Sequence, residues 1–176
     1  MEWARDARLS DVFVVHGTKK FRDRVKGQKA EHLQQSTTAL GAWYATALFW
    51  KPRAALFVNE STLLPVLMPL APAATVLDRF PTTLAGVLRA HQVDDGFVAR
   101  EVVEMSEWQL VSTSNRRVVG VMNDFADLVS EYAASRGGED LVSLSLRLSR
   151  TSSGPLYGRH GSADRELTWL VAQRGS

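Results

Sequence analysis

The chain contains no cysteine. This absence excludes disulfide bonds, cysteine-ligated zinc and thiol nucleophiles together, and it is typical of proteins that work in a reducing compartment. The N-terminal residues also lack the continuous apolar core of a secretory signal. We therefore expect a cytoplasmic protein.

Long hydrophobic runs and a strong net charge are lacking as well. The longest apolar run, 63–77, contains three prolines and is shorter than the roughly 20 residues that span a bilayer, so no membrane partner is expected. The 21 Lys and Arg against 19 Asp and Glu leave a net charge of only +2, which does not by itself indicate nucleic-acid binding. No glycine-rich phosphate loop, nucleophile elbow or metal-spaced histidine set occurs, and we expect neither a cofactor nor a metal site.

What is present fits one globular domain. Hydrophobic residues make up 45% of the chain and charged residues 23%, which are ordinary values for a globular protein. A chain of 176 residues is long enough to bury most of its apolar surface. We expect a single domain, 1–176, with flexible ends at 1–10 and 173–176.

Hydrophobic periodicity predicts an α+β fold, with a mostly antiparallel or mixed sheet and helices packed on one face. The predicted strands are 11–16, 40–50, 54–58, 108–113, 141–148 and 167–172. The predicted helices are 19–26, 62–67, 83–91, one that starts at 94 or 95, and 115–135. The polar segments 27–38 and 151–162 are predicted to be loops.

Two polar clusters follow predicted strands, where ligands often bind in sheet proteins. In the first, Lys19 and Lys20 come directly after Thr18, and their ammonium groups can meet a phosphate. The alternative is an exposed first helical turn. In the second, Asn59 and Thr62 follow a hairpin strand and can hydrogen-bond a ligand, or they can simply cap a helix.

The third cluster, at 115–124, opens the best-supported helix and is the most informative stretch of the chain. Helical spacing places Arg116 and Asn123 on one stripe and Arg117 and Asp124 on a parallel one. Gly120 lies one turn after Arg116 without a side chain, so a ligand or another backbone can approach closely. The candidate ligand-binding residues of the three clusters are Lys19, Lys20, Asn59, Thr62, Asn115, Arg116, Arg117, Asn123 and Asp124.

The fourth cluster is the loop 152–160, which either closes over a site with Tyr157, Arg159 or His160 or is an ordinary connection. His16, at the end of a strand, is either a structural residue or a general base. No residue is assigned a catalytic role.

Several of these stretches together resemble a family of small bacterial proteins built on a domain of unknown function. The matching motifs are Thr-Lys-Lys at 18–20, Trp-x-Ala at 43–45, Asn-x-x-Thr-Leu at 59–63 and Arg-x-Val-x-Gly-x-Met-Asn-Asp at 116–124. The last of these motifs is the most specific. The resemblance implies shared positions but no particular reaction.

The sequence favours a protein that binds a phosphate-bearing ligand, either a nucleotide or a nucleic acid, at a basic and Asn-rich site. This hypothesis requires Lys19, Asn59 and Arg116 to converge on one recess. An enzyme that processes phosphodiesters or nucleotides, with Asp124 or His16 as base, is an alternative. Another is a protein-interaction module of a two-gene bacterial system, whose acidic region 94–107 would meet a basic protein partner. The sequence does not decide the oligomeric state.

Overall fold

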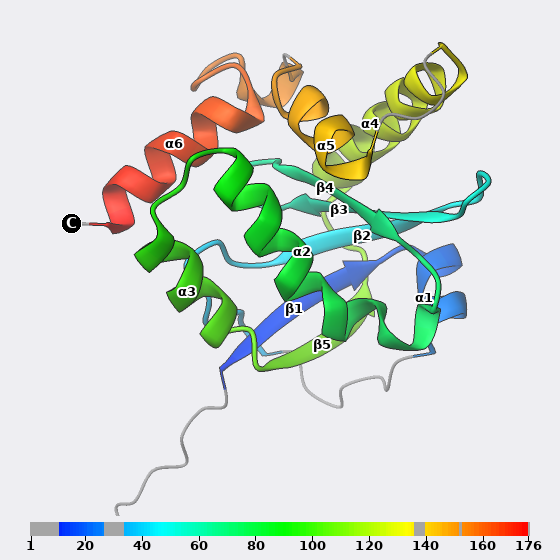
Figure 1. The fold of residues 1–176 in the computed structure, drawn as a ribbon, viewed down its shortest axis with the longest axis horizontal. Helices are drawn as coiled ribbons and strands as arrows, with labels where there is room; N and C mark the ends of the chain where they lie inside the picture. Colours follow the sequence, from blue (N-terminus) through cyan, green and yellow to red (C-terminus); the bar gives the residue numbers. More distant parts are fainter. Residues whose placement is uncertain (1–10, 27–33, 136–139, 152, 176) are drawn as a thin grey trace, which may run out of the picture.

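The structure, a computed structural model, describes residues 11–26, 34–135, 140–151 and 153–175 (Figure 1). The predicted ends at 1–10 and most of the predicted loop 27–38 lie outside the described residues. The elements are β1 (Val12–Gly17), α1 (Lys19–Val25), β2 (Trp43–Leu48), β3 (Ala54–Asn59), β4 (Pro65–Pro69), η1 (Ala73–Thr75), α2 (Val76–Ala90), α3 (Asp95–Val103), β5 (Glu107–Ser112), α4 (Arg116–Ser135), α5 (Leu141–Ser149), η2 (Gly154–Leu156) and α6 (Ala163–Arg174).

The strands form one five-stranded mixed sheet in the order β4-β3-β2-β1-β5. β1 runs parallel to both β2 and β5, whereas β2, β3 and β4 are joined as antiparallel neighbours. The predicted α+β class with a mixed sheet is therefore confirmed. Because β1 and β5 are parallel, their carboxyl ends lie side by side, with Gly17 opposite Ser112.

Alternate side chains of the central strands enter two different hydrophobic clusters. Trp43, Ala45 and Ala47 belong to the cluster on the first face, which also takes its apolar residues from α1, α2 and α3. Tyr44 and Leu48 belong to the cluster on the second face, which is covered by α4 and α5. Helices thus cover both faces, not the single face that the sequence predicted, because β2 and β3 are buried on both sides.

α5 also protects the edge of the sheet beside β4 (Figure 1). The Ser145 hydroxyl accepts a hydrogen bond from the backbone N–H of Leu67 at 2.9 Å and donates to the Leu141 carbonyl at 2.7 Å. An edge strand with free N–H groups invites unwanted pairing. The buried Ser145 hydroxyl gives one of those N–H groups a hydrogen-bond partner.

The helix predicted at 62–67 is wrong. A turn occupies residues 60–62, and the chain then returns as β4, paired with β3. Leu63 takes a left-handed conformation, with φ of 59°, that a helix cannot contain. Asn59 therefore closes a strand connection and does not cap a helix.

The strands predicted at 141–148 and 167–172 are also wrong, since both segments are helical. In α5, Leu144 and Leu148 are buried one turn apart, and Asp140 caps the helix by accepting from the Ser143 N–H at 2.9 Å. Short segments with alternating leucines fit both periods, so periodicity alone misassigned them. α6 continues to Arg174.

Among the described residues, no helix combines the length and the apolar character that crossing a membrane requires.

Candidate anion-binding site

A cavity of about 370 Å³ lies at the start of α4. It is lined by Thr113, Ser114, Arg116, Val119, Gly120 and Asn123. Three of these residues, Arg116, Gly120 and Asn123, form the helical stripe predicted from their spacing. The cavity is therefore a groove that runs from the end of β5 along the first two turns of α4.

Local hydrogen bonds fix the first turn of α4. The Asn115 side-chain oxygen accepts from the backbone N–H groups of Arg117 at 3.1 Å and Val118 at 3.4 Å, as an N-cap residue does. The Asn115 backbone N–H donates to the Tyr44 hydroxyl at 3.1 Å, which ties the helix to β2. The capping oxygen of Asn115 is thus not free for a ligand.

Positive charge at this helix end has no counterion among the described residues. Arg116 and Arg117 are exposed, the first turn of α4 contains no acid, and neither arginine forms an ion pair within the described part of the chain. A helix N-terminus already carries partial positive charge, so the helix dipole disfavours arginines at this end. A bound anion would relieve both effects.

Gly120 keeps the groove open. A Cβ atom added at this position would meet nothing within 4 Å. Glycine inside a helix costs about 1 kcal/mol relative to alanine. The residue therefore has no packing reason, within the described structure, to lack a side chain.

A histidine and a tyrosine lie next to the groove. The rings of His16 and Tyr44 are stacked, with centroids 4.6 Å apart and planes 11° apart. His16 Nδ1 lies 3.1 Å from the Ser112 carbonyl oxygen, which can only accept, so Nδ1 carries the hydrogen and Nε2 of the neutral ring is an acceptor. The Tyr44 hydroxyl lies 3.3 Å from the Ser114 hydroxyl, which lines the groove.

The Asn59 amide is fully used inside the protein. Its nitrogen donates to the carbonyls of Leu40 at 2.8 Å and Ala42 at 3.3 Å. Its oxygen accepts from the Ser61 N–H and from the N–H and hydroxyl of Thr62, at 2.9–3.1 Å. Both Asn59 and Thr62 are completely buried. These two predicted site residues therefore hold the turn between β3 and β4 and present nothing to a ligand.

The two lysines lie apart from the groove. Lys19 pairs with Asp23 at 2.8 Å on the surface of α1, and the Lys20 ammonium lies 6.0 Å from the centre of the Phe49 ring. α1 buries its apolar residues in the first-face cluster, whereas α4 buries its own in the second-face cluster. Lys19, Asn59 and Arg116 consequently do not line one recess.

Within the third cluster, Arg116 and Asn123 line the groove, whereas Arg117 and Asp124 do not. Asn123 and Asp124 are both exposed, and neither side chain bonds to another described residue. Adjacent residues with similar side chains thus differ in whether they reach the groove.

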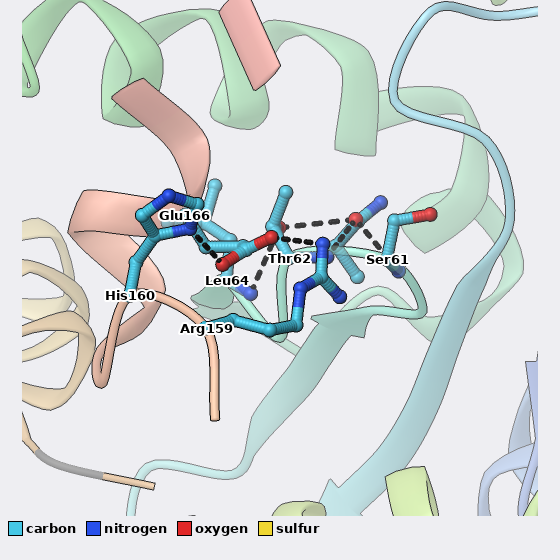
Figure 2. Close-up of polar contacts among 7 residues, drawn as sticks. Ser61, Thr62, Leu64, Arg159, His160 and Glu166 are labelled. Atoms are coloured by element: carbon cyan, nitrogen blue, oxygen red, sulfur yellow. Dashed lines mark hydrogen bonds and ion pairs between the residues drawn. The ribbon is translucent and has the colours of Figure 1, made fainter. Parts of the chain in front are cut away.

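The loop before α6 is tied inward. Figure 2 shows Arg159 and His160 reaching the carboxylate of Glu166, which is only 1% exposed. His160 Nδ1 lies 2.6 Å from one carboxylate oxygen, and Arg159 forms an ion pair with the other. Tyr157 points to solvent, and residue 152 lies outside the described part of the chain. The predicted loop thus anchors α6, and its arginine and histidine already contact the Glu166 carboxylate.

Sequence reasoning missed Glu101, a buried acid in α3. Its carboxylate accepts from the backbone N–H groups of Ala39 at 3.0 Å and Leu40 at 3.1 Å. Burial raises the pKa of the Glu101 carboxyl to about 7, although the hydrogen bonds from Leu40 and Ala39 lower it. Its position between the buried Val98 and Met105, at helical spacing, was the sequence signal for an inward-facing acid.

Fold and site together describe an α+β domain with an open cationic groove at a helix start. Residues 14–166 match the model of the family described as Domain of unknown function (DUF6933), and the chain belongs to that family. Comparison with curated proteins and with solved structures gave no match.

Proposed function

We propose that this protein binds a compact phosphate-bearing ligand, such as a nucleotide, in the groove at the start of α4. The observation that carries the proposal is the exposed Arg116 guanidinium beside a cavity of about 370 Å³, with no acidic partner among the described residues. Small-molecule pockets usually measure roughly 300–1,000 Å³, so the cavity has room for such a ligand.

The groove supplies complementary chemistry to a phosphate. Arg116 presents a planar fork of donors that suits phosphate oxygens. The hydroxyls of Thr113 and Ser114 and the amide of Asn123 add neutral donors on the same lining. Gly120 leaves space for the rest of the ligand. The charge therefore comes from one arginine, while the neighbouring groups give direction.

Arg116 and Arg117 provide a matched test, because they are adjacent, equally charged and both exposed, yet only Arg116 lines the groove. Binding of ATP, AMP and inorganic phosphate to the full chain would be measured by calorimetry. We expect Arg116→Gln to weaken nucleotide binding at least tenfold, the loss of about 1.4 kcal/mol from one charge-assisted contact. Arg117→Gln should change binding by no more than about threefold, because long-range charge is screened.

A second variant, Gly120→Leu, fills the groove without changing charge. It should abolish nucleotide binding while the chain stays folded, as judged by circular dichroism, because the added side chain points into open space. Equal weakening by Arg116→Gln and Arg117→Gln would show diffuse attraction in place of a site. No binding by the unmodified protein at millimolar nucleotide would reject the proposal outright.

A further inference from the structure

A second cationic surface lies around an exposed phenylalanine, away from the α4 groove. The Phe49 side chain is 49% exposed. Three cationic groups surround its ring, with Lys20 Nζ at 6.0 Å, Arg24 Cζ at 5.1 Å and Arg53 Cζ at 5.8 Å from the ring centre. We call these four residues, with the exposed Lys51, the Phe49 surface.

Three separate segments build this surface. Phe49 directly follows β2, and Arg53 directly precedes β3, so both lie at the tip of the β2–β3 hairpin. Lys20 and Arg24 lie four residues apart on the outer side of α1. Figure 1 shows the hairpin tip and α1 at the same end of the molecule. The tertiary fold, not one basic run of sequence, therefore gathers these charges.

The gathered charges are not neutralised within the described residues. No carboxylate there pairs with Lys20, Arg24 or Arg53, and the nearest acid in sequence, Asp23, is taken by Lys19 at 2.8 Å. Contact with the aromatic ring attracts each cation and holds it in place. The three like charges nevertheless repel each other. A ligand with several negative charges would reduce this repulsion, so the surface attracts such a ligand.

We propose that the Phe49 surface binds single-stranded nucleic acid, with successive phosphates against Lys20, Arg24 and Arg53 and a base against the Phe49 ring. Proteins that bind single strands combine a cationic track for the backbone with aromatic rings on which bases stack. An exposed ring among cations supplies both parts. An acidic protein segment would use the charges but would have no particular need of the ring.

An anionic membrane surface fits these observations less well. Stable attachment to a bilayer requires a sizeable apolar area to enter it. Among the described residues of this surface only Phe49 could enter a bilayer, because the neighbouring Trp50 is half-buried and packs against the second-face cluster. The cationic groups also lie around the Phe49 ring itself, and they do not leave an apolar tip free to enter a bilayer.

The proposal does not depend on a nucleotide in the α4 groove, because the two sites share no residue. The test uses the full chain and a fluorescently labelled 12-nucleotide oligo(dT) or oligo(U), with anisotropy measured from 50 to 300 mM salt. The double variant Arg24→Gln/Arg53→Gln should weaken binding at least tenfold at 50 mM salt. It should also reduce the slope of log K against log[salt] by about 1.4, since each lost phosphate contact contributes about 0.7 for single strands.

Phe49→Leu keeps an apolar side chain but removes the aromatic face. It should weaken binding about fivefold or more and leave the salt slope unchanged, because stacking does not release counterions. The matched control is Arg89→Gln/Arg165→Gln, which removes the same charge from exposed positions on α2 and α6 and should change binding by less than threefold. Arg116→Gln should have an equally small effect on strand binding, even if it abolishes nucleotide binding.

Three outcomes would overturn the proposal. The first is no binding of either oligonucleotide at 50 mM salt. The second is equal weakening by the Phe49-surface variants and the control, or a dominant effect of Arg116→Gln. The third is binding to phosphatidylserine vesicles that the Phe49-surface variants remove, without oligonucleotide binding, which would assign the surface to a membrane.

Discussion

The turn after β3 and the start of α4 are both rich in asparagine and hydroxyl groups, yet they differ in how much of their polar capacity the protein uses. The Asn59 side chain makes five hydrogen bonds to neighbouring groups and is completely buried. The Asn123 side chain is exposed on an open groove and bonds to no described residue.

This difference separates a structural cluster from a candidate binding site. A buried polar side chain must be satisfied from within the protein, because leaving it unpaired is costly. A side chain on the wall of a cavity keeps its donors and acceptors for water or a ligand. The same residue type therefore stabilises the fold at position 59 and remains available at position 123.

Removing the two side-chain amides should give the largest difference in stability between the two regions. Asn59→Ala should lower the free energy of unfolding by about 4 kcal/mol, because it leaves the buried Leu40 carbonyl and two backbone N–H groups without their partner. Asn123→Ala should raise it by a few tenths of a kcal/mol, since alanine is the better helix former. Urea denaturation measures both. Similar values for the two variants would remove the distinction between the regions.

Glu101 hydrogen-bonds to the same segment, 39–42, as Asn59, but it does so through a group that titrates. Its pKa is about 7 when folded, against an ordinary value of 4.5, so between these two pH values the folded chain retains a proton that the unfolded chain releases. Stability from this group is therefore lost as the pH rises through that window, by about 3 kcal/mol in all.

The corresponding variant is Glu101→Gln, whose amide does not titrate. The unfolding free energy of the unmodified protein minus that of the variant should fall by about 2.5 kcal/mol between pH 5 and pH 8. Denaturant titrations at the two pH values measure this difference. A difference that is the same at both pH values would show that the Glu101 carboxyl titrates near its ordinary pKa.

Substitution of Gly120 should have a smaller effect than substitution of Asn59 or Glu101. Gly120→Ala should stabilise the protein by about 1 kcal/mol, because alanine favours the helix and its Cβ meets nothing within 4 Å. Gly17→Ala is the control, since a Cβ there would lie 3.0 Å from side-chain atoms of Phe21, Arg22 and Leu110. It should destabilise the protein. Thermal unfolding compares the two, and destabilisation by Gly120→Ala would mean that the groove is packed.

Elements with one clear period were predictable from the sequence. The apolar run at the start of β1 and the three- and four-residue spacing in α4 correspond to the observed strand and helix. α5 and α6 were not predictable in this way, because nine to twelve residues with mixed spacing fit either period. The turn at 60–62 depends on hydrogen bonds from Asn59 to distant backbone groups, which no local pattern contains.

The candidate site was predictable only in part. The stripe of Arg116, Gly120 and Asn123 follows from helical geometry, and the structure places all three on one groove. Whether Lys19, Asn59 and Arg116 converge depends on which face of the sheet each helix covers, and the sequence does not specify this. Phe49 and its ring of cations involved three segments whose contact has no signature in sequence spacing.

The sequence by itself determined the periodic faces of the strands, the helix that begins after Asn115 and the stripe of groups on its first turns, because these depend on repeats of two and 3.6 residues. Only the tertiary structure decided which polar groups are consumed inside the protein and which stay open. That outcome depends on long-range pairing across the sheet, where a neighbour in space is many residues away in the chain.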